Sequence, residues 1–291
     1  MNGIYVSPEG ARTVEQRYRE YLERWPVPSE HLRVPTRQGE TFVVACGPKD
    51  APPLMLLHGS MANTSMWMAD VAAWSRDFRV YAVDMIGEPG LSAPSRPPLA
   101  SDAYALWLDD VLQGLGVRRV SIVGVSLGGW LATDYATRNP ERVDRLALLC
   151  PGGIGRQKTG WLLLALLLLS FGKWGRRKAL GVILGPTAPA TTPEAQAFGE
   201  YMMLINKHFR PRREKIPVFD DDALRRLTMP MLVIVGGLDT VLDSHDTRRR
   251  LEQAVPHATV NLLPDAGHLL EGQTMPILDF LRAPEGARPH V

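Results

Sequence analysis

Short apolar runs alternate with segments of helical periodicity along most of the chain. The run PLMLLHG is continuous, as expected for a strand that is covered on both faces. The pattern predicts strands at residues 31–36, 41–47, 53–59, 78–84, 118–125, 143–150, 229–237 and 258–268. It predicts helices at residues 12–25, 66–77, 102–115, 127–138, 246–255 and 275–283.

This alternation of strands and helices favours a parallel sheet with right-handed crossovers. The alternation of strands and helices stops between residues 151 and 217, where Gly, Pro and helical stretches occur without a convincing strand. We therefore expect an α/β core formed by residues 1–150 and 218–283, with residues 151–217 inserted between two strands of its sheet. The Pro- and Gly-rich residues 284–291 are expected to be a flexible tail.

A serine stands between two glycines where the strand at 118–125 must turn into the helix at 127–138. Such a reversal forces the turning residue into a strained backbone conformation, so small residues are needed two positions before and after it. Gly124 and Gly128 supply these small residues. In this context the pattern G-x-S-x-G predicts a nucleophile elbow that lifts the hydroxyl of Ser126 clear of the sheet edge.

A serine nucleophile needs a base that is itself held by a third group. Of the seven histidines, His268 stands between the last predicted strand and the last predicted helix, and we assign it as the base. The acid should leave another strand at the same edge of the sheet. Asp239, three residues after Gly236, is the first candidate, and Asp243 is the alternative. The chain order serine, aspartate, histidine is that of the α/β-hydrolase triad.

The oxyanion of a tetrahedral intermediate needs hydrogen-bond donors that are in place beforehand. The backbone N–H of Leu127, directly after the nucleophile, is one candidate. The second is the amide of Ser60, in the loop that follows the strand at 53–59. In this interpretation His58 and Gly59 shape the loop, and His58 supports it without being catalytic.

The composition argues against nucleic-acid binding and against a metal site. Among 291 residues, 33 basic and 31 acidic side chains give a net charge of +2. The protein therefore lacks the strong positive field that would favour binding to nucleic acid. The two cysteines, Cys46 and Cys150, lie far apart, and no spacing of His, Cys or carboxylates indicates a metal site. We expect two buried thiols in a reducing cytoplasm, with no metal and no cofactor.

The sequence predicts no membrane-spanning segment. Residues 1–25 lack the apolar core of a secretory signal. The longest apolar run, at 161–171, has eleven residues, whereas a span needs about twenty. Basic residues follow this run, which leaves attachment to a membrane surface open, but a buried helix is the preferred interpretation.

With these motifs, the chain resembles the α/β-hydrolase superfamily over nearly its whole length. Within that superfamily it is similar to bacterial carboxylesterases of the naproxen-esterase (carboxylesterase NP) type. The resemblance is carried by the motifs LLHGS, VDMIGEPGLS, GVSLGG, GGLD and AGH. It implies a mostly parallel eight-stranded sheet, a helical cap after the sixth strand, and ester hydrolysis without a cofactor. It implies the same roles for Ser126, Asp239 and His268, with oxyanion amides on Ser60 and Leu127.

One loop departs from the superfamily pattern. The usual sequence after the fourth strand is D-x-x-G-x-G-x-S. Here Gly87 fits, but Pro89 stands in the place of the second glycine and Gly90 comes one residue later. Because that loop borders the mouth of the pocket, the substrate can differ from that of any relative.

The predicted cap carries the residues that we expect to line the substrate pocket. Trp161, Met202 and Met203 would form an apolar roof suited to a small-molecule ester with a small or medium hydrophobic acyl or aryl group. The same triad could serve a lactonase, a carbon–carbon bond hydrolase or a perhydrolase. A cyclase or a binding protein that reuses this pocket is the alternative from another class. The sequence leaves both monomer and homodimer open.

Overall fold

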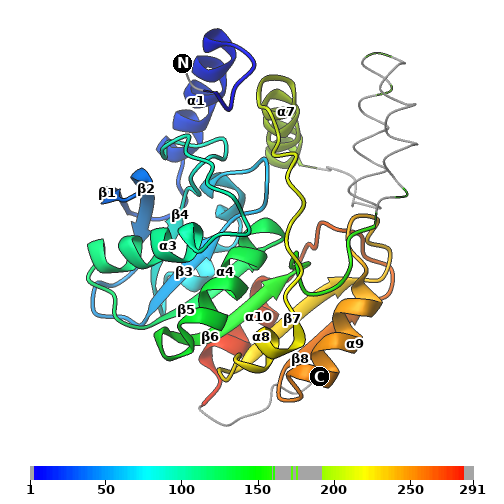
Figure 1. Cartoon of the computed structure of the whole chain (residues 1–291). Coiled ribbons are helices and arrows are strands. Elements are labelled where there is room, and N and C mark those ends of the chain that lie inside the picture. Colours follow the sequence, from blue (N-terminus) through cyan, green and yellow to red (C-terminus); the bar gives the residue numbers. More distant parts are fainter. Residues whose placement is uncertain (1–2, 159, 161–171, 173–174, 176–191, 285–291) are drawn as a thin grey trace.

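The computed structural model describes residues 3–158, 160, 172, 175 and 192–284. Its centre is an eight-stranded sheet with the order β1-β2-β4-β3-β5-β6-β7-β8 (Figure 1). β2 pairs antiparallel with β1 and β4, whereas the neighbours from β4 to β8 are parallel. The expected mostly parallel sheet is therefore confirmed. The strands are β1 (Ser29–Thr36), β2 (Gly39–Cys46), β3 (Pro53–Leu57), β4 (Arg79–Val83), β5 (Val120–Val125), β6 (Val143–Leu149), β7 (Met231–Gly236) and β8 (Thr259–Leu263).

Helices flank both faces of this sheet (Figure 1). The α-helices are α1 (Pro8–Glu23), α2 (Val71–Trp74), α3 (Ala103–Gly114), α4 (Leu127–Arg138), α7 (Pro193–His208), α8 (Asp221–Arg225), α9 (Ser244–Ala254) and α10 (Thr274–Arg282). Two short 3₁₀ helices are η1 (Thr64–Trp67) and η2 (Pro140–Arg142).

Two apolar clusters form the core, one on each face of the sheet. Along β3, Leu54 and Leu56 belong to one cluster and Met55 and Leu57 to the other, as the alternation of side chains along a strand requires. The cluster around Met55 includes side chains of α3, α4 and α9. The cluster around Leu54 includes side chains of α1, α2, α7 and α10. The sheet is thus covered on both faces, which explains its continuous apolar strands.

The helix predicted at residues 66–77 is wrong, because the chain forms η1 and then the four-residue α2 instead. The side chain of Asn63 caps η1 by accepting the Ser65 amide at 3.2 Å. Trp67, Val71 and Trp74 are all buried. Their spacing of four and three residues suits two short turns as well as one continuous helix, so the apolar pattern alone could not separate the two.

Two other elements, α1 and β8, have a bound that differs by about four residues or more from the prediction. α1 begins at Pro8, four residues before the predicted start, because Ser7 caps it and accepts the Gly10 amide at 3.0 Å. β8 ends at Leu263, before the end of the predicted strand, where Pro264 cannot donate to a ladder.

The segment between β6 and β7 contributes α7, which packs beside α1 (Figure 1). The backbone N–H of Val6 donates to the His208 carbonyl at 2.8 Å, and that of Arg210 donates to the Ile4 carbonyl at 2.8 Å. Tyr5 and Phe209 meet edge to face, with their ring centroids 5.8 Å apart. The N-terminal residues and α7 therefore form one layer.

The division into core, inserted cap and tail stays a prediction. The apolar run at 161–171, with Trp161, and nearly all of the predicted tail lie outside the described residues. Among the helices that the structure does describe, none combines the length and the apolar character that crossing a membrane requires. Cys46 and Cys150 are free thiols and both are buried, as predicted.

Candidate active site

Three polar side chains come together where β5, β7 and β8 end at the same edge of the sheet. Ser126 follows β5 directly, Asp239 stands three residues after β7, and His268 stands five residues after β8. Carboxyl ends of parallel strands share one edge, and this edge is where open α/β sheets place their binding sites.

The backbone at Ser126 has the strained form that the sequence predicts. Its φ of 51° and ψ of −108° place a non-glycine residue at positive φ, between the end of β5 and the first residue of α4. A Cβ on Gly124 would lie 2.6 Å from the carbonyl oxygen of Gly128. A Cβ on Gly128 would lie 2.2 Å from the carbonyl oxygen of Leu57. Both positions therefore need glycine, because α4 lies this close to β5 and to β3.

The side chains of Ser126, His268 and Asp239 form a continuous hydrogen-bond relay. Nδ1 of His268 lies 2.7 Å from Oδ2 of Asp239, and its Nε2 lies 3.0 Å from Oγ of Ser126. Because a carboxylate can only accept, Nδ1 carries the ring proton and Nε2 is left to accept from the serine hydroxyl. Asp239 and His268 are buried, whereas Ser126 is partly exposed. The imidazole is therefore aligned to take a proton from a serine that a ligand can reach.

The carboxylate of Asp239 is held on both oxygens. Its Oδ1 accepts the backbone amides of Val241 at 2.7 Å and Leu242 at 3.0 Å. Burial works to raise the pKa of Asp239, but the hydrogen bond and charge of His268 and these two amides outweigh it, so the pKa lies below its ordinary value. Asp239 is therefore ionised at neutral pH.

Asp243, the alternative acid, is engaged elsewhere. It is the N-cap of α9, and its Oδ1 accepts the backbone amide of Asp246 at 3.1 Å. Of the two carboxylates weighed from the sequence, the structure brings Asp239 to His268 and gives Asp243 a capping position.

Cys150 also belongs to this edge, although its sequence position predicted only that it is buried. It follows β6 directly and has a positive φ of 41°. Among the described residues, one group could bring three metal-ligating side chains together. It consists of Cys150, Asp239 and His268, whose ligand atoms lie within 4.8 Å of one another. Its position after a parallel strand was the signal that could have placed it here.

This group is poorly suited to a metal ion. Both ring nitrogens of His268 already lie in hydrogen bonds, to Asp239 and Ser126. Burial raises the pKa of the Cys150 thiol well above its ordinary value, and the negative charge of Asp239 raises it further. A neutral thiol is a weak metal ligand, because the thiolate is the form that binds.

The loop after β3 passes directly beside the nucleophile. A Cβ built on Gly59 would lie 3.8 Å from the Cβ of Ser126. His58 is buried, its Nε2 accepts the Met85 amide at 2.9 Å, and its Nδ1 donates to the Gly59 carbonyl at 2.8 Å. Burial lowers the pKa of His58 to about 4, which keeps the ring neutral. Ser60 is exposed on this loop.

Of the three residues predicted to line the pocket, the structure describes two. Met202 is half-buried against the cluster around Leu54, and Met203 is exposed on α7. Trp161 lies outside the described residues. Their place in a substrate pocket stays a prediction.

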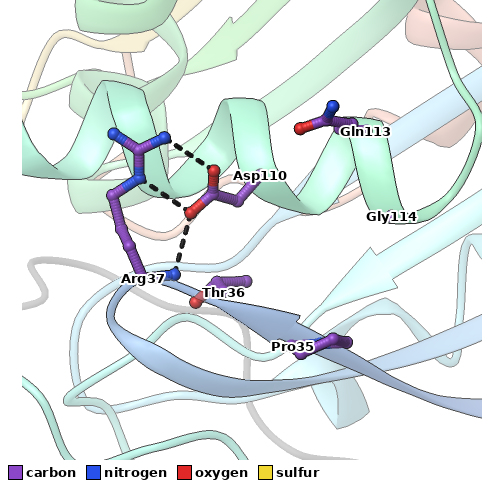
Figure 2. Close-up of a pocket in the computed structure, with 6 residues that line it drawn as sticks. All are labelled: Pro35, Thr36, Arg37, Asp110, Gln113 and Gly114. Atoms are coloured by element: carbon purple, nitrogen blue, oxygen red, sulfur yellow. Dashed lines mark hydrogen bonds and ion pairs between the residues drawn. The ribbon is translucent and has the colours of Figure 1, made fainter.

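A surface hollow elsewhere on the molecule shares no residue with this site. It lies between the end of β1 and α3 and has a volume of about 400 Å³ (Figure 2). Its charged groups satisfy one another, because Arg37 donates to the Asp110 carboxylate through its backbone N, Nε and Nη2, each at 2.8 Å (Figure 2). The hollow therefore offers no free charge to a ligand.

Comparison with known proteins gives relatives over almost the whole chain. The carboxylesterase nap of Bacillus subtilis is 32% identical over 277 residues, which cover 88% of this chain and 86% of that protein. Carboxylesterase YbfK of the same organism is 32% identical over 272 residues, which cover 91% of this chain and 90% of that protein.

Solved structures agree with these sequence matches. The structure of carboxylesterase CesB (YbfK) from Bacillus subtilis matches with a TM-score of 0.80 and 30% identity, over 94% of this chain and 99% of that chain. Naproxen esterase (carboxylesterase NP) from Bacillus subtilis matches with a TM-score of 0.77 and 32% identity, over 92% and 94% of the two chains. The family model described as the alpha/beta hydrolase family matches residues 54–281. The resemblance inferred from the motifs is confirmed, and the chain belongs to the alpha/beta hydrolase family.

Proposed function

We propose that this protein is a carboxylic ester hydrolase that works through an acyl-enzyme on Ser126. The observation that carries the proposal is the relay in which His268 lies 3.0 Å from the serine hydroxyl and 2.7 Å from Asp239. The relatives named carboxylesterases, at 32% identity over most of both chains, support the same chemistry.

In this mechanism, Ser126 Oγ attacks the ester carbonyl carbon while Nε2 of His268 takes the hydroxyl proton. Asp239 stabilises the resulting imidazolium and fixes the ring tautomer without taking the proton itself. Collapse of the tetrahedral intermediate expels the alcohol, which receives the proton from His268. Water, activated by the same imidazole, then attacks the acyl carbon, releases the carboxylic acid and restores the serine.

The backbone amides of Leu127 and Ser60 would hold the oxyanion. Leu127 is the first residue of α4, where amides are not used by the helix and where the helix dipole favours negative charge. The loop that carries Ser60 lies beside the nucleophile, as the position of Gly59 shows. Removing one such donor costs about 2.7–4 kcal/mol of transition-state stabilisation in enzymes of this kind.

The substrate would be an ester with a small or medium hydrophobic acyl or aryl group. Leu238 and Leu269, the neighbours in sequence of the acid and the base, are 50% and 41% exposed. Large apolar side chains exposed beside a reacting centre favour an apolar ligand. The name of the related naproxen esterase makes 2-arylpropionate esters one group to test.

A panel of p-nitrophenyl esters from acetate to octanoate, together with naproxen methyl ester, tests the proposal. We expect turnover of the short and aryl esters, and a loss of about 10⁴-fold or more in kcat for Ser126→Ala. Thermal unfolding of the variant checks that its fold is kept. Absence of turnover across the panel would remove the esterase proposal. Lactones and meta-cleavage products, assayed in parallel, would identify another reaction of the same triad.

We further propose that the enzyme acts in the cytoplasm on a small molecule, as a monomer or homodimer, without a nucleic-acid partner or a cofactor. Its two free thiols and its net charge of +2 support this setting. Fractionation of cells that express the full chain, followed by size-exclusion chromatography with light scattering, tests location and assembly separately. Activity found in the membrane fraction would contradict the first part of this proposal.

A further inference from the structure

The loop after β4 carries one residue more than the usual superfamily spacing. A Cβ on Gly90 would lie 2.5 Å from Oδ2 of Asp84, so the second glycine is required where it stands, close to that buried carboxylate. Leu91 donates its backbone amide to the same oxygen at 2.8 Å. The additional length therefore falls between Gly87 and Gly90, where Glu88 and Pro89 stand.

These two residues reach across to the loop that follows β3. Oε2 of Glu88 accepts the backbone N–H of Met61 at 2.7 Å and lies 3.4 Å from Oγ of Ser60. The Pro89 carbonyl accepts the side-chain amide of Asn63 at 2.7 Å. Residues 60–63 are therefore tied to the β4 loop at both ends.

The hydrogen bond from Glu88 holds a residue with a strained backbone. Met61 has a φ of 61°, which is unfavourable for a side chain larger than glycine and persists where surrounding contacts enforce it. Glu88 is only 2% exposed, so its carboxylate stays in place by accepting hydrogen bonds rather than by contact with water. A hydrogen bond from a backbone amide to a carboxylate is stronger than one to a neutral acceptor.

We propose that Glu88 is a positioning residue of the oxyanion loop: its carboxylate fixes the turn at Ser60 and Met61 so that the Ser60 amide faces the carbonyl attacked by Ser126. This inference rests on the proposed function, because it assigns a task within the same reaction. Glu88 acts through its hydrogen bond with the backbone of Met61.

The surroundings of Glu88 make this support sensitive to pH. Burial raises the pKa of Glu88 to about 7, while the Met61 amide and the charges of two arginines act to lower it. The charged and titratable groups that face it are Arg96, Arg212, Tyr5 and Tyr104. The carboxylate is the form that holds the Met61 amide best, so the support strengthens as the pH rises through the pKa.

Two substitutions separate the hydrogen bond from packing. Glu88→Gln keeps the shape and an acceptor but removes the charge, and Glu88→Leu removes the acceptor. Because a displacement of about 1 Å at a reacting centre costs about 10²-fold, we expect Glu88→Leu to lower kcat by about 10²-fold. We expect a smaller loss, about tenfold, for Glu88→Gln, with KM within about threefold of wild type in both. Glu40→Gln, at an exposed glutamate paired with Arg33, is the matched control and should leave kcat unchanged.

The pH dependence of kcat/KM provides a readout that a purely structural role would not change. In the wild type, the carboxylate of Glu88 is the form that holds the Met61 amide, so ionisation of Glu88 should contribute to the acid limb near pH 7. In Glu88→Gln this contribution should be absent. Titration of active sites with diethyl p-nitrophenyl phosphate corrects each rate for the fraction of folded enzyme.

The possible outcomes are distinct. If both variants keep the kcat of the wild type per titrated site, the proposal is wrong. It is equally wrong if activity falls only in proportion to the number of titratable sites, because Glu88 then supports folding alone. If Glu88→Leu does not fold, the isosteric Glu88→Gln and its pH profile decide. A wild-type enzyme without any esterase activity would instead refute the proposed function.

Discussion

The Asp239→Asn substitution tests the proposed triad most directly, because the side chain keeps its shape while one oxygen becomes an NH₂ group. Oδ1 of Asp239 accepts the amides of Val241 and Leu242, so the oxygen of the new side chain must stay on that side. Its NH₂ then faces Nδ1 of His268 and forces that nitrogen to accept. The ring proton moves to Nε2, and the imidazole can no longer take the proton of Ser126.

The expected loss follows from the tautomer and not from a loss of packing. We expect kcat to fall about 10⁴-fold, as for the equivalent change in a serine protease triad. At about 1.4 kcal/mol for each factor of ten, this is about 5 kcal/mol of transition-state stabilisation. KM should change little, because the binding surface is unaltered. Initial rates with p-nitrophenyl butyrate, corrected for folded protein by circular dichroism, measure both parameters.

The Asp243→Asn substitution is the matched control. Asp243 caps α9, and asparagine is as good an N-cap as aspartate, so both stability and kcat should stay near those of the wild type. Two results would refute the reasoning. One is an Asp239→Asn enzyme whose kcat lies within tenfold of the wild type. The other is a large loss in Asp243→Asn, which would move the role of the acid to that residue.

Two further predictions concern stability. Because burial lowers the pKa of His58 to about 4, the unfolded chain binds a proton below about pH 6.5 that the folded chain does not, and stability is lost as the pH falls. His58→Gln should remove about 2 kcal/mol of the loss between pH 7 and pH 5 that urea unfolding measures in the wild type; equal slopes in the two proteins would contradict this. Gly124→Ala should destabilise by about 3 kcal/mol or more because its Cβ meets the Gly128 carbonyl, whereas Gly199→Ala, in open space on α7, should be neutral or stabilising by up to about 1 kcal/mol. Equal urea midpoints for the two alanine variants would show that the elbow tolerates a side chain.

The residues that the sequence predicted best are those with a local signal. The preceding strand and the following helix were enough to interpret Gly124, Ser126 and Gly128 as a nucleophile elbow. The strained φ of Ser126 agrees with that interpretation. Asp239 and His268 could be proposed because both follow strands whose ends share one edge of the sheet. The distances that join them are a property of the folded sheet and of no single segment.

The residues that the sequence could not place depend on contacts between distant segments. Oδ1 of the buried Asp84 accepts the Thr64 amide at 3.0 Å and the hydroxyl of Tyr18 at 2.8 Å, from a helix 66 positions earlier in the chain. Likewise, no local pattern around Glu88 indicates that its carboxylate accepts the Met61 amide. Periodicity and motif spacing report burial and local conformation, but they do not report which buried polar groups meet.

The pairing of α7 with the N-terminal residues has a consequence for exchanging parts between relatives. Backbone hydrogen bonds join Val6 to His208 and Ile4 to Arg210, and the rings of Tyr21 and Tyr201 stand 5.0 Å apart. A chimaera that takes α7 from another esterase but keeps this N-terminus would set two unmatched surfaces against each other. Replacing α7 therefore requires roughly residues 4–25 to be replaced together with it, because the two segments pack as one unit.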